Sequence, residues 1–495
     1  MSLFLSSSRF MQSCLHVFRH LFAVTKLLRL VKSMNRSALV IGSGPNGMSA
    51  AIVLAQAGWR VLVREASDRI GGGASSAELT LPGFVHDVGS AVHPLAVASP
   101  FFSSLPLDVR WIHGTAPLAH PLDDGTAVML HRDLGETARN LGTDGIPWAK
   151  LYGPVVRDWE IFRHELLKPL GWTKHPFRMA RFGLNAVLSA EFLADSRFAG
   201  ERARALFTGL AAHYPFLNQP LSAGFGLVLG ASAHAVGWPI PEGGAQAISD
   251  CLVSKLRALG GDVVTASRVE SLAGEEGIVM ADVSPRALAE IAGARLPVDF
   301  RKRLGRYRYG PGSFKMDWAL REPIPWRARD CALAATVHIG GSAEEIRASE
   351  RSAVRGEVSE RPFVLLSQPT LFDASRAPLG KHVVWAYCHT PAGSKVDRAE
   401  HIERQIERFA PGFRDCILAR HVAGPSDLEL GNENLVGGDV TGGISDISQT
   451  LFRPTWRRYG TPDRAIYLCS SSTPPGAGVH GMCGYYAALG ALRNS

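Results

Sequence analysis

The sequence predicts an α/β fold: a discontinuous, Rossmann-like dinucleotide-binding domain with an inserted α+β domain that contains an antiparallel sheet. Three observations lead to this prediction. A glycine loop opens the chain between a strand-like and a helix-like segment at 37–65, a helix-and-strand block returns at 237–272, and a further strand-like segment with a glycine loop closes it at 465–495. At 495 residues, the chain is also longer than one compact core usually allows.

The opening segment has every part of a βαβ unit. "SALVIGS" (37–43) reads as a buried strand, "PNGMSAAIVLAQAG" as a helix that ends at Gly58, and "WRVLVRE" as a second strand. The glycines between the first strand and the helix suit a tight turn, the approach of the backbone to a pyrophosphate, and close helix–strand packing. The loop residues expected to bind the dinucleotide are Gly42, Gly44, Pro45, Asn46 and Gly47.

An acidic residue ends the second strand of this unit. Glu65 lies 18 residues past Gly47, where a carboxylate can accept hydrogen bonds from a ribose hydroxyl. Its charge also disfavours a 2′-phosphate, so tight binding of NADP is not expected at this site.

The residues after Glu65 favour FAD over NAD. "ASDRIGGGASS" supplies Arg69 and two glycines, and "GFVHDVGSAVHP" (83–94) follows. These segments resemble those of the flavoprotein family that includes phytoene dehydrogenases and flavin amine oxidases. In that family an Arg-x-Gly-Gly segment supports the pyrophosphate and the ribityl chain of FAD. The resemblance therefore adds these FAD-binding candidates: Ala66, Arg69, Gly71 and Gly72.

The block at 237–272 extends the resemblance. Its apolar spacing predicts a helix over 247–256 that ends at Gly260 and Gly261. The family has a strand next, whose backbone meets the adenine, which implies that Val269 makes this contact. Relatives then have a three-stranded meander, but here "AGEEGI" leads directly to "VMADVSP" (279–285), so the meander is expected to be missing or very short.

Motifs further along the chain are similar to one branch of this family, typified by pyridine nucleotide-disulfide oxidoreductase domain-containing protein 2. They are "RYGPGSFKMDWAL" (308–320), "TVHIGG" (336–341), "WAYCHTP" (385–391), "ERFAPGFRD" (407–415), "GGDVTGG" (437–443) and "YLCSSSTPPGAGVHGMCGYYAA" (467–488). Eukaryotic members of the branch are mitochondrial and linked to respiratory function. The resemblance would imply a respiratory-chain partner if this chain is mitochondrial too.

The closing motif repeats the Gly-x-Gly-x-x-Gly spacing from Gly476 to Gly481. It follows its strand at too great a distance, and only eleven residues come after Gly484, too few for a second βαβ unit. We therefore expect a stiff loop and a helix that grip the same FAD from the other end of the chain. The resemblance places Gly478, Val479 and His480 beside the flavin.

These motifs divide the chain. We expect the FAD-binding domain at 34–100, 239–306 and 455–495, and the substrate domain at 101–238 and 307–454. In the substrate domain, "SFKMDWAL", "ATVHIG", "PFVLLSQP" and "HVVWAYCH" are expected to form the antiparallel sheet. "DRAEHIERQIERFA" (397–410) predicts a helix capped by Asp397 with Glu400 in a capping box.

Residues 1–33 differ from the rest: they are basic and hold no acid. Two interpretations stay open, a mitochondrial transit peptide and a non-functional extension before a start at Met34. The compartment accordingly stays open between a bacterial-type cytoplasm and the mitochondrial matrix. The formal net charge is +8, yet the basic residues are scattered, which argues against nucleic acid and leaves peripheral membrane contact as an expectation.

The reaction is expected to depend on the cofactor rather than on a catalytic triad. The seven cysteines include no Cys-x-x-Cys, and His480-x-x-Cys483 lacks a second ligand pair, so neither dithiol chemistry nor a metal is expected. We expect hydride transfer from a largely apolar organic substrate to FAD. A carotenoid-type desaturase and a flavin-binding regulatory protein with little turnover are the alternatives. His480 is the one weak candidate for an acid or base. Candidates for the pocket wall are Trp238, Phe314, Trp318, Trp385, Tyr387, His389 and His480.

Overall fold

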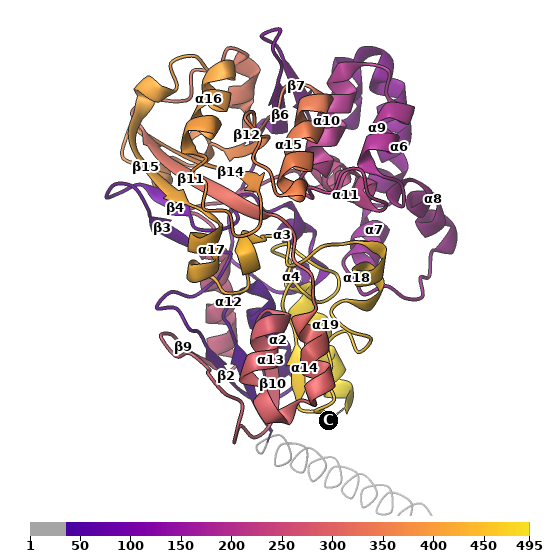
Figure 1. Ribbon diagram of the computed structural model, residues 1–495, viewed down its shortest axis with the longest axis vertical. Coiled ribbons are helices and arrows are strands. Elements are labelled where there is room, and N and C mark those ends of the chain that lie inside the picture. Colours follow the sequence, from indigo (N-terminus) through magenta and orange to yellow (C-terminus); the bar gives the residue numbers. More distant parts are fainter. Residues whose placement is uncertain (1–35, 495) are drawn as a thin grey trace, which may run out of the picture.

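The computed structural model describes residues 36–494, so the basic leader at 1–33 lies outside the described residues. A five-stranded parallel sheet forms the lower part of the molecule in Figure 1, in the order β16-β10-β1-β2-β9. Three distant stretches of chain contribute its strands: β1 (Ser37–Ile41), β2 (Arg60–Arg64), β9 (Asp262–Val264), β10 (Ile278–Ala281) and β16 (Ile466–Leu468). The strand at the start of the described chain is therefore the centre of this sheet.

Helices cover both faces of the parallel sheet. On β1, Ala38 and Val40 belong to one hydrophobic cluster, whereas Leu39 and Ile41 belong to another on the opposite face. This continuous apolar run is what a strand buried on both faces requires. One face carries α2 (Pro45–Gln56), α12 (Gln246–Ala258) and α19 (Met482–Asn494), and the other carries α13 (Pro285–Ile291) and α14 (Val298–Gly305).

A seven-stranded sheet occupies the upper part, in the order β15-β11-β14-β13-β12-β6-β7. Its neighbouring strands pair antiparallel except β12 and β6, which pair parallel. Helix α16 (Ala399–Phe409) packs its apolar side against one face. The strands are β6 (Ala116–Pro121), β7 (Ala127–Leu130), β11 (Gly312–Leu320), β12 (Ala334–Ile339), β13 (Val364–Ser367), β14 (His382–Thr390) and β15 (Ile417–Ala423).

A group of helices lies beside this sheet, on the right in Figure 1: α6 (Gly145–Arg157), α7 (Trp159–Leu166), α8 (Pro176–Ala186), α9 (Ala190–Arg197), α10 (Glu201–Ala211) and α11 (Ser222–Ala235). The remaining α-helices are α3 (Pro94–Ala98), α4 (Pro100–Ser104), α5 (Leu134–Asn140), α15 (Ala343–Arg355), α17 (Pro425–Gly431) and α18 (Ile447–Phe452). Two small two-stranded antiparallel sheets complete the fold: β3 (Ser76–Glu78) with β4 (Val85–Asp87), and β5 (Trp111–Ile112) with β8 (Ile240–Pro241). None of the described helices combines the length and hydrophobicity needed to cross a bilayer.

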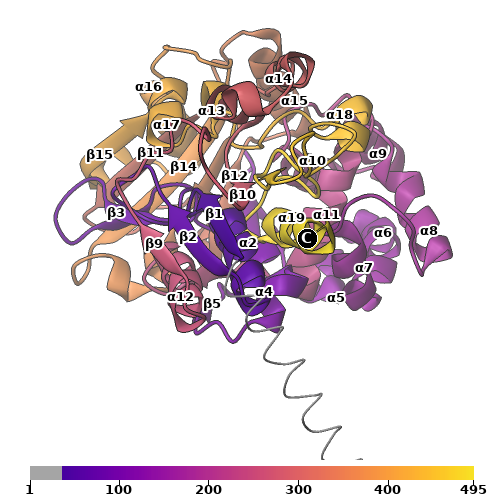
Figure 2. The same ribbon diagram turned by 90° about the horizontal axis from the view of Figure 1, so that it is seen from below.

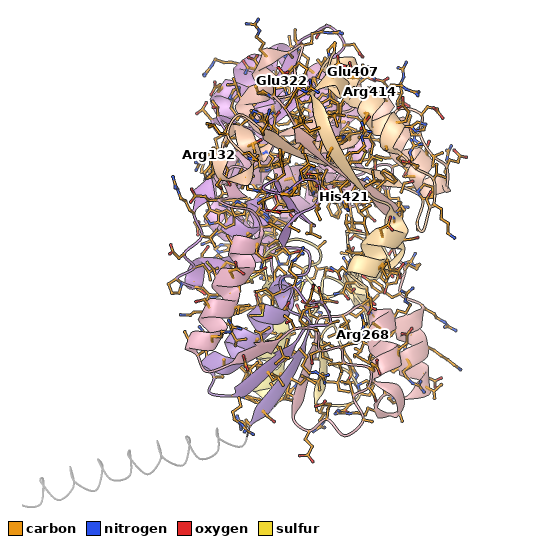
Figure 3. All side chains as sticks on the ribbon, turned by 90° about the vertical axis from the view of Figure 1, so that its left-hand side faces the viewer. Arg132, Arg268, Glu322, Glu407, Arg414 and His421 are labelled. Carbon is orange, nitrogen blue, oxygen red and sulfur yellow. The ribbon has the colours of Figure 1, made fainter. Side chains whose placement is uncertain are left out.

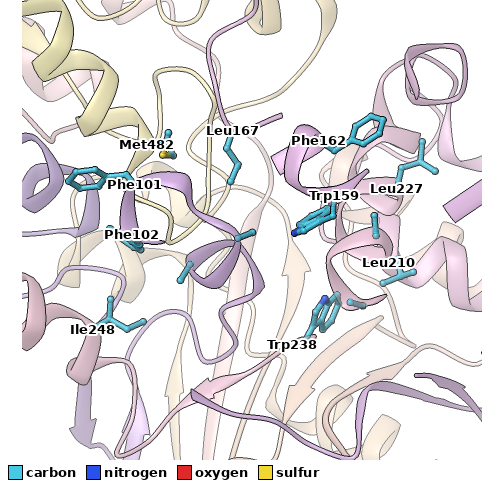
Figure 4. Close-up of a cluster of buried hydrophobic side chains, with 14 of the residues drawn as sticks. Phe101, Phe102, Trp159, Phe162, Leu167, Leu210, Leu227, Trp238, Ile248 and Met482 are labelled. Atoms are coloured by element: carbon cyan, nitrogen blue, oxygen red, sulfur yellow. The ribbon is translucent and has the colours of Figure 1, made fainter. Parts of the chain in front are cut away.

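One hydrophobic cluster joins the two parts. It runs from Ile248 and Met482, beside the parallel sheet, through Phe101 and Phe102 to Trp159 and neighbouring residues of the helical region (Figure 4). Because the two parts share a core, the space between their sheets is fixed by packing.

The four segments predicted to form an antiparallel sheet do so as β11, β14, β13 and β12, and β6 and β7 extend this sheet through a parallel pairing of β6 with β12. One detail differs from the sequence prediction. In α16, Arg398 rather than Asp397 is the N-cap residue, and no capping box forms. Asp397 instead accepts a hydrogen bond from the Ala399 N–H at 2.8 Å, while Glu400 pairs with Arg414. The expected loss of the meander is confirmed, because residues 265–277 contain no strand.

Candidate active site

A cavity of about 2070 Å³ lies between the two sheets. Pockets for one drug-sized ligand usually measure about 300–1,000 Å³, so this cavity has room for a dinucleotide and a second molecule. Helix α2 points its first turn at the cavity, and both Gly44 and Asn46 line it. Gly44 is the N-cap of α2 and contributes no side-chain cap; Pro45 has no N–H and the Gly47 N–H bonds Asp282, so the Asn46 N–H is the donor of the first turn left to a ligand.

Steric limits explain why glycine occupies these positions of the loop. A Cβ atom on Gly47 would lie 2.1 Å from the carbonyl oxygen of Gly42, so only glycine lets α2 pack this closely on β1. A Cβ on Gly44 would lie 2.9 Å from Oδ2 of Asp282, on the wall of the cavity. Gly42 has φ of +94° and donates its N–H to the Arg64 carbonyl at 2.9 Å, which makes the tight turn. The cradle therefore fits a group that approaches the backbone closely.

Glu65 connects the glycine loop to the Arg-x-Gly-Gly segment. Its Oε2 accepts hydrogen bonds from the N–H of Ser43 at 2.8 Å and from the Ser43 hydroxyl at 2.7 Å. The same hydroxyl oxygen accepts the Gly71 N–H at 3.0 Å. Glu65 also lines the cavity, as expected of a residue that would bind ribose hydroxyls.

Asp282 is a carboxylate at the helix N-terminus that the sequence prediction missed. It follows β10, is 7% exposed, and accepts the Gly47 N–H at 2.8 Å. Burial raises the pKa of Asp282 to about 7; the Gly47 hydrogen bond opposes this rise and the charge of Glu65 adds to it. Its position at the carboxyl end of a strand next to β1 is the signal that could have found it.

The adenine end of the predicted site lies near Val269. This residue is buried, lines the cavity, and has backbone groups with no hydrogen-bond partner among residues 36–494. Arg268 beside it pairs with Glu433 at 2.7 Å and also lines the cavity. Figure 3 shows Arg268 in the part that carries the parallel sheet, with His421 at the near edge of the seven-stranded sheet.

The closing loop completes the cavity from the far end of the chain. Gly478 has φ of +130°, and a Cβ there would lie 2.8 Å from Leu95. A Cβ on Gly484 would lie 1.7 Å from the Asn46 carbonyl oxygen, so α19 packs directly against the start of α2. The glycines of the closing segment thus serve close packing around the first glycine loop.

His480 stabilises this loop. Its Nδ1 accepts the Met482 N–H at 3.0 Å, and its carbonyl oxygen accepts the Ser99 hydroxyl at 2.6 Å. Burial lowers the pKa of His480 to about 4, although hydrogen bonding to the backbone of Gly476 and Ala477 acts in the opposite direction. The imidazole is therefore neutral at pH 7, with its proton on Nε2.

The structure places the predicted FAD-binding residues in two groups. Gly47 and Gly71 lie behind the cavity wall, where Gly47 packs on β1 and Gly71 shapes a turn. The others line the cavity: Gly42, Gly44, Pro45, Asn46, Glu65, Ala66, Arg69, Gly72, Val269, Gly478, Val479 and His480.

Because successive side chains of a strand point to opposite faces of the sheet, only some of the residues predicted to form the wall of the substrate pocket line the cavity. Trp385 and Tyr387 on β14 line the cavity, as does Trp238. Phe314 and Trp318 on β11 instead lie in the core on the opposite face of the sheet, so their prediction as wall residues was wrong. The prediction for His389 was also wrong: it shares the face of β14 with Trp385 and Tyr387, but it lies beyond the cavity lining and bonds Glu350 through Nδ1 at 2.6 Å.

A charged cluster on the cavity side of β11 was also missed. Lys315 is 4% exposed, lines the cavity and donates a hydrogen bond to Asp317. His421 bonds the same Asp317 carboxylate at 3.2 Å and is part-exposed at the cavity. Burial acts to raise the pKa of Asp317, but the charge of Lys315 and the hydrogen bond from His421 outweigh it and hold the pKa below its usual value. The sequence signal that could have indicated this cluster is the presence of Lys315 and Asp317 within the otherwise largely apolar β11.

Four more buried polar atoms on the cavity side of the seven-stranded sheet have no hydrogen-bond partner among the described residues. They come from four neighbouring strands of the sheet, and buried polar groups without partners are rare in proteins. A bound molecule that offers hydrogen bonds would satisfy them. The atoms are Ser313 Oγ, Thr336 Oγ1, Ser367 Oγ and Trp385 Nε1.

No three His, Cys, Asp or Glu side chains within residues 36–494 are grouped as metal ligands. The cysteines described there are free, and most of them are buried.

The site lies between a Rossmann-like parallel sheet and a second sheet, an arrangement similar to that of FAD/NAD(P)-binding oxidoreductases. Residues 40–103 match the family model described as "NAD(P)-binding Rossmann-like domain". The chain is similar to pyridine nucleotide-disulfide oxidoreductase domain-containing protein 2 of Mus musculus, with 26% identity over 92% of this chain and 93% of that protein. It is also similar to 4,4'-diapolycopen-4-al dehydrogenase of Metabacillus indicus, with 30% identity over 25% of this chain and 26% of the relative.

Solved structures show the same fold. An oxidoreductase from Methanosarcina mazei superposes with a TM-score of 0.62 at 17% identity, covering 92% of this chain and 99% of the other. A triple mutant of putrescine oxidase superposes with a TM-score of 0.60 at 16% identity, covering 93% and 99%. The predicted resemblance to phytoene dehydrogenase-like and amine oxidase-like proteins is confirmed by these relatives and solved structures, which are oxidoreductases by name.

Proposed function

We propose that the chain is an FAD-dependent oxidoreductase that takes hydride from a largely apolar organic substrate with one polar end. The observation that carries the proposal is that one cavity is lined by the glycine loop, the closing loop and the second sheet. The donor of the hydride and its acceptor could therefore meet within the same cavity.

The residues present fit FAD. Gly44 and Asn46 at the start of α2 would hold the pyrophosphate, Glu65 the adenosine ribose, and Gly478 with His480 the flavin end. Bound FAD would supply the hydride acceptor of the reaction. The carboxylate of Glu65 supports FAD or NAD over a 2′-phosphorylated nucleotide.

The cavity walls support an amphiphilic substrate. Apolar side chains from the helical region line one part of the cavity, whereas Lys315 and the unpartnered hydroxyls lie on the sheet floor. Lys315, held by Asp317, is placed to orient an electron-rich polar group of the substrate. The apolar lining residues include Leu167, Phe182, Phe225, Val228 and Trp238.

Two alternatives are separated from this proposal by experiment. The likeness to a diapolycopenal dehydrogenase over a quarter of the chain favours a carotenoid-type desaturase as the second candidate. A flavin-binding regulatory protein with little turnover is the other. Anaerobic stopped-flow mixing of the purified yellow protein with candidate donors should bleach the flavin band near about 450 nm. Bleaching by polyenes alone would favour the desaturase, and no bleaching by any donor would favour the regulatory protein.

A variant of Lys315 tests whether the polar residues on the cavity side of the seven-stranded sheet orient the substrate. Lys315→Met keeps the length of the side chain but removes its charge, and should slow flavin reduction while FAD stays bound. Unchanged reduction rates and substrate affinity in this variant would remove Lys315 from the proposal.

A further inference from the structure

Two surface segments expose large apolar side chains. We define the α8 segment as residues 166–190 and the α18 segment as residues 447–462. In the α8 segment Trp172 is 99% exposed and Phe177 is 90% exposed. In the α18 segment Trp456 is 78% exposed and lies against exposed Phe452, with ring centroids 4.7 Å apart and the rings tilted by 38°. Other exposed apolar residues of these segments are Leu170, Leu184, Val187, Ile447 and Leu451.

The same segments are basic. Neither contains an Asp or a Glu. The α8 segment carries Lys168, Lys174, Arg178 and Arg181. Lys168 and Arg178 have ion-pair partners, Glu165 and Asp158, whereas none is found for Lys174 or Arg181 among the described residues. The α18 segment adds Arg457 and Arg458 to buried Arg453.

Both segments contribute residues to the cavity wall, and one of these, Leu170, is 52% exposed, so the cavity opens to the surface beside the α8 segment. Leu170, Phe182 and Ala186 of the α8 segment line the cavity, as do Thr450 and Arg453 of the α18 segment. Helices α8 and α18 lie on the right-hand side of the molecule in Figure 1, and again in Figure 2, where the view is from below. The exposed aromatic residues therefore flank an opening that leads to the candidate active site.

We propose that the α8 and α18 segments dock this face on an anionic lipid bilayer, with the cavity mouth toward the lipid. Aromatic residues are favoured at the membrane interface, and basic residues beside them are attracted to anionic headgroups. Phe177 and Leu184 are seven residues apart and share one face of α8, with Arg181 close by on that face. This pairing of aromatic and basic groups on a short helix suits an interfacial contact.

Charge argues for lipid over a second copy of the chain. Docking of two such faces would bring together two sets of basic side chains with no acid in either segment. An anionic bilayer instead matches both the charge and the apolar side chains. The docking does not depend on the reaction, but delivery of an apolar substrate from the bilayer rests on the proposed function.

Vesicle flotation of the full chain tests the docking. We would use phosphatidylcholine vesicles with and without about one-third phosphatidylglycerol. Trp172→Ala combined with Phe177→Ala should weaken binding to the anionic vesicles about tenfold or more. Lys174→Ala combined with Arg181→Ala should weaken it about fivefold for each residue removed, and added salt should have the same effect as this second pair.

The matched control removes two exposed apolar side chains elsewhere, Leu379 and Val298. Leu379→Ala combined with Val298→Ala should bind as the wild type does. The proposal is overturned if the wild-type chain does not float with anionic vesicles, or if all variants bind equally. A wild-type dimer that the aromatic pair of substitutions converts to a monomer, without vesicle binding, would assign the face to a second copy instead. Turnover of a water-soluble donor, measured in parallel, separates failure of docking from failure of the proposed function.

Discussion

At the scale of single residues, the first glycine loop requires glycine because a Cβ atom would lie too close to neighbouring oxygen atoms. Gly44 and Gly47 both lie close to Asp282, and Gly47 also meets the Gly42 carbonyl oxygen. Their roles could be predicted because the spacing of glycines, strand and acid is local. The role of Asp282 could not, because its partner Gly47 is 235 residues away and no short motif records that contact.

The first prediction is that Gly44→Val abolishes FAD binding. A branched side chain would extend from a Cβ already 2.9 Å from Asp282 Oδ2 and fill the space that a pyrophosphate needs. The purified variant should be colourless, with FAD well below one per chain after reconstitution. Gly490→Val is the control, because a Cβ there meets nothing within 4 Å. A yellow Gly44→Val protein at wild-type stoichiometry would falsify this reading of the loop.

The second prediction concerns the pH dependence of Asp282→Asn. The pKa of Asp282 is raised to about 7 in the folded chain, so its stabilising effect is complete below the unfolded value of 3.8 and is lost as the pH rises through about 7. Asn cannot ionise, so the variant should gain about 2–3 kcal/mol relative to wild type between about pH 5 and about pH 8. The free energy of unfolding at both pH values measures this gain.

Asp415→Asn, at an exposed position, is the matched control and should follow the wild-type pH profile. Parallel pH profiles for the wild type and Asp282→Asn would show that Asp282 does not titrate in this range.

At the scale of elements, alternation along strands explains what the sequence could and could not predict. The β11 motif was expected to be a strand, and it is; which of its faces meets the cavity depends on a neighbour far along the chain. Trp318 therefore packs against α16, and Lys315 faces the cavity. The parallel pairing of β6 with β12 is similarly non-local, and nothing within 116–121 indicates it.

The third prediction tests the contact between α19 and α2. Gly484→Ala would place a Cβ 1.7 Å from the Asn46 carbonyl oxygen and force the two helices apart. We expect a loss of about 1–3 kcal/mol in stability, with weaker FAD retention because Asn46 lines the cavity. Gly490→Ala, in the same helix, should instead be neutral or stabilising. Equal unfolding midpoints for the two variants would contradict this packing.

The fourth prediction concerns the closing loop. Gly478→Leu combines a φ of +130° with a Cβ 2.8 Å from Leu95, so the loop must shift beside the flavin end of the cavity. The flavin spectrum, its reduction potential or its retention should change. Affinity for NAD(P)H, where measurable, should not. Loss of NAD(P)H affinity with normal FAD binding would mean that the closing loop holds a second nucleotide.

At the scale of the whole molecule, both ends of the described chain meet at one cavity. β1 and β16 lie in the same sheet, and α19 packs on α2. This arrangement could be inferred from the sequence only through the resemblance to known flavoproteins, because the chain between the two ends is more than 400 residues long. One ligand in this cavity would contact segments from the start, middle and end of the chain.

The last prediction follows from this closure: each chain should bind one FAD and no tight NADP. FAD at about a hundred times its dissociation constant should add about 2.7 kcal/mol to stability, because it binds only the folded chain. The measurements are the FAD released on denaturation and the unfolding midpoint during parallel titrations with FAD and with NADPH. NADPH should give no shift, because Glu65 would face its 2′-phosphate across the ribose. A shift with NADPH and none with FAD would reverse the choice of cofactor, even though the cavity and its glycine cradle would stay as described.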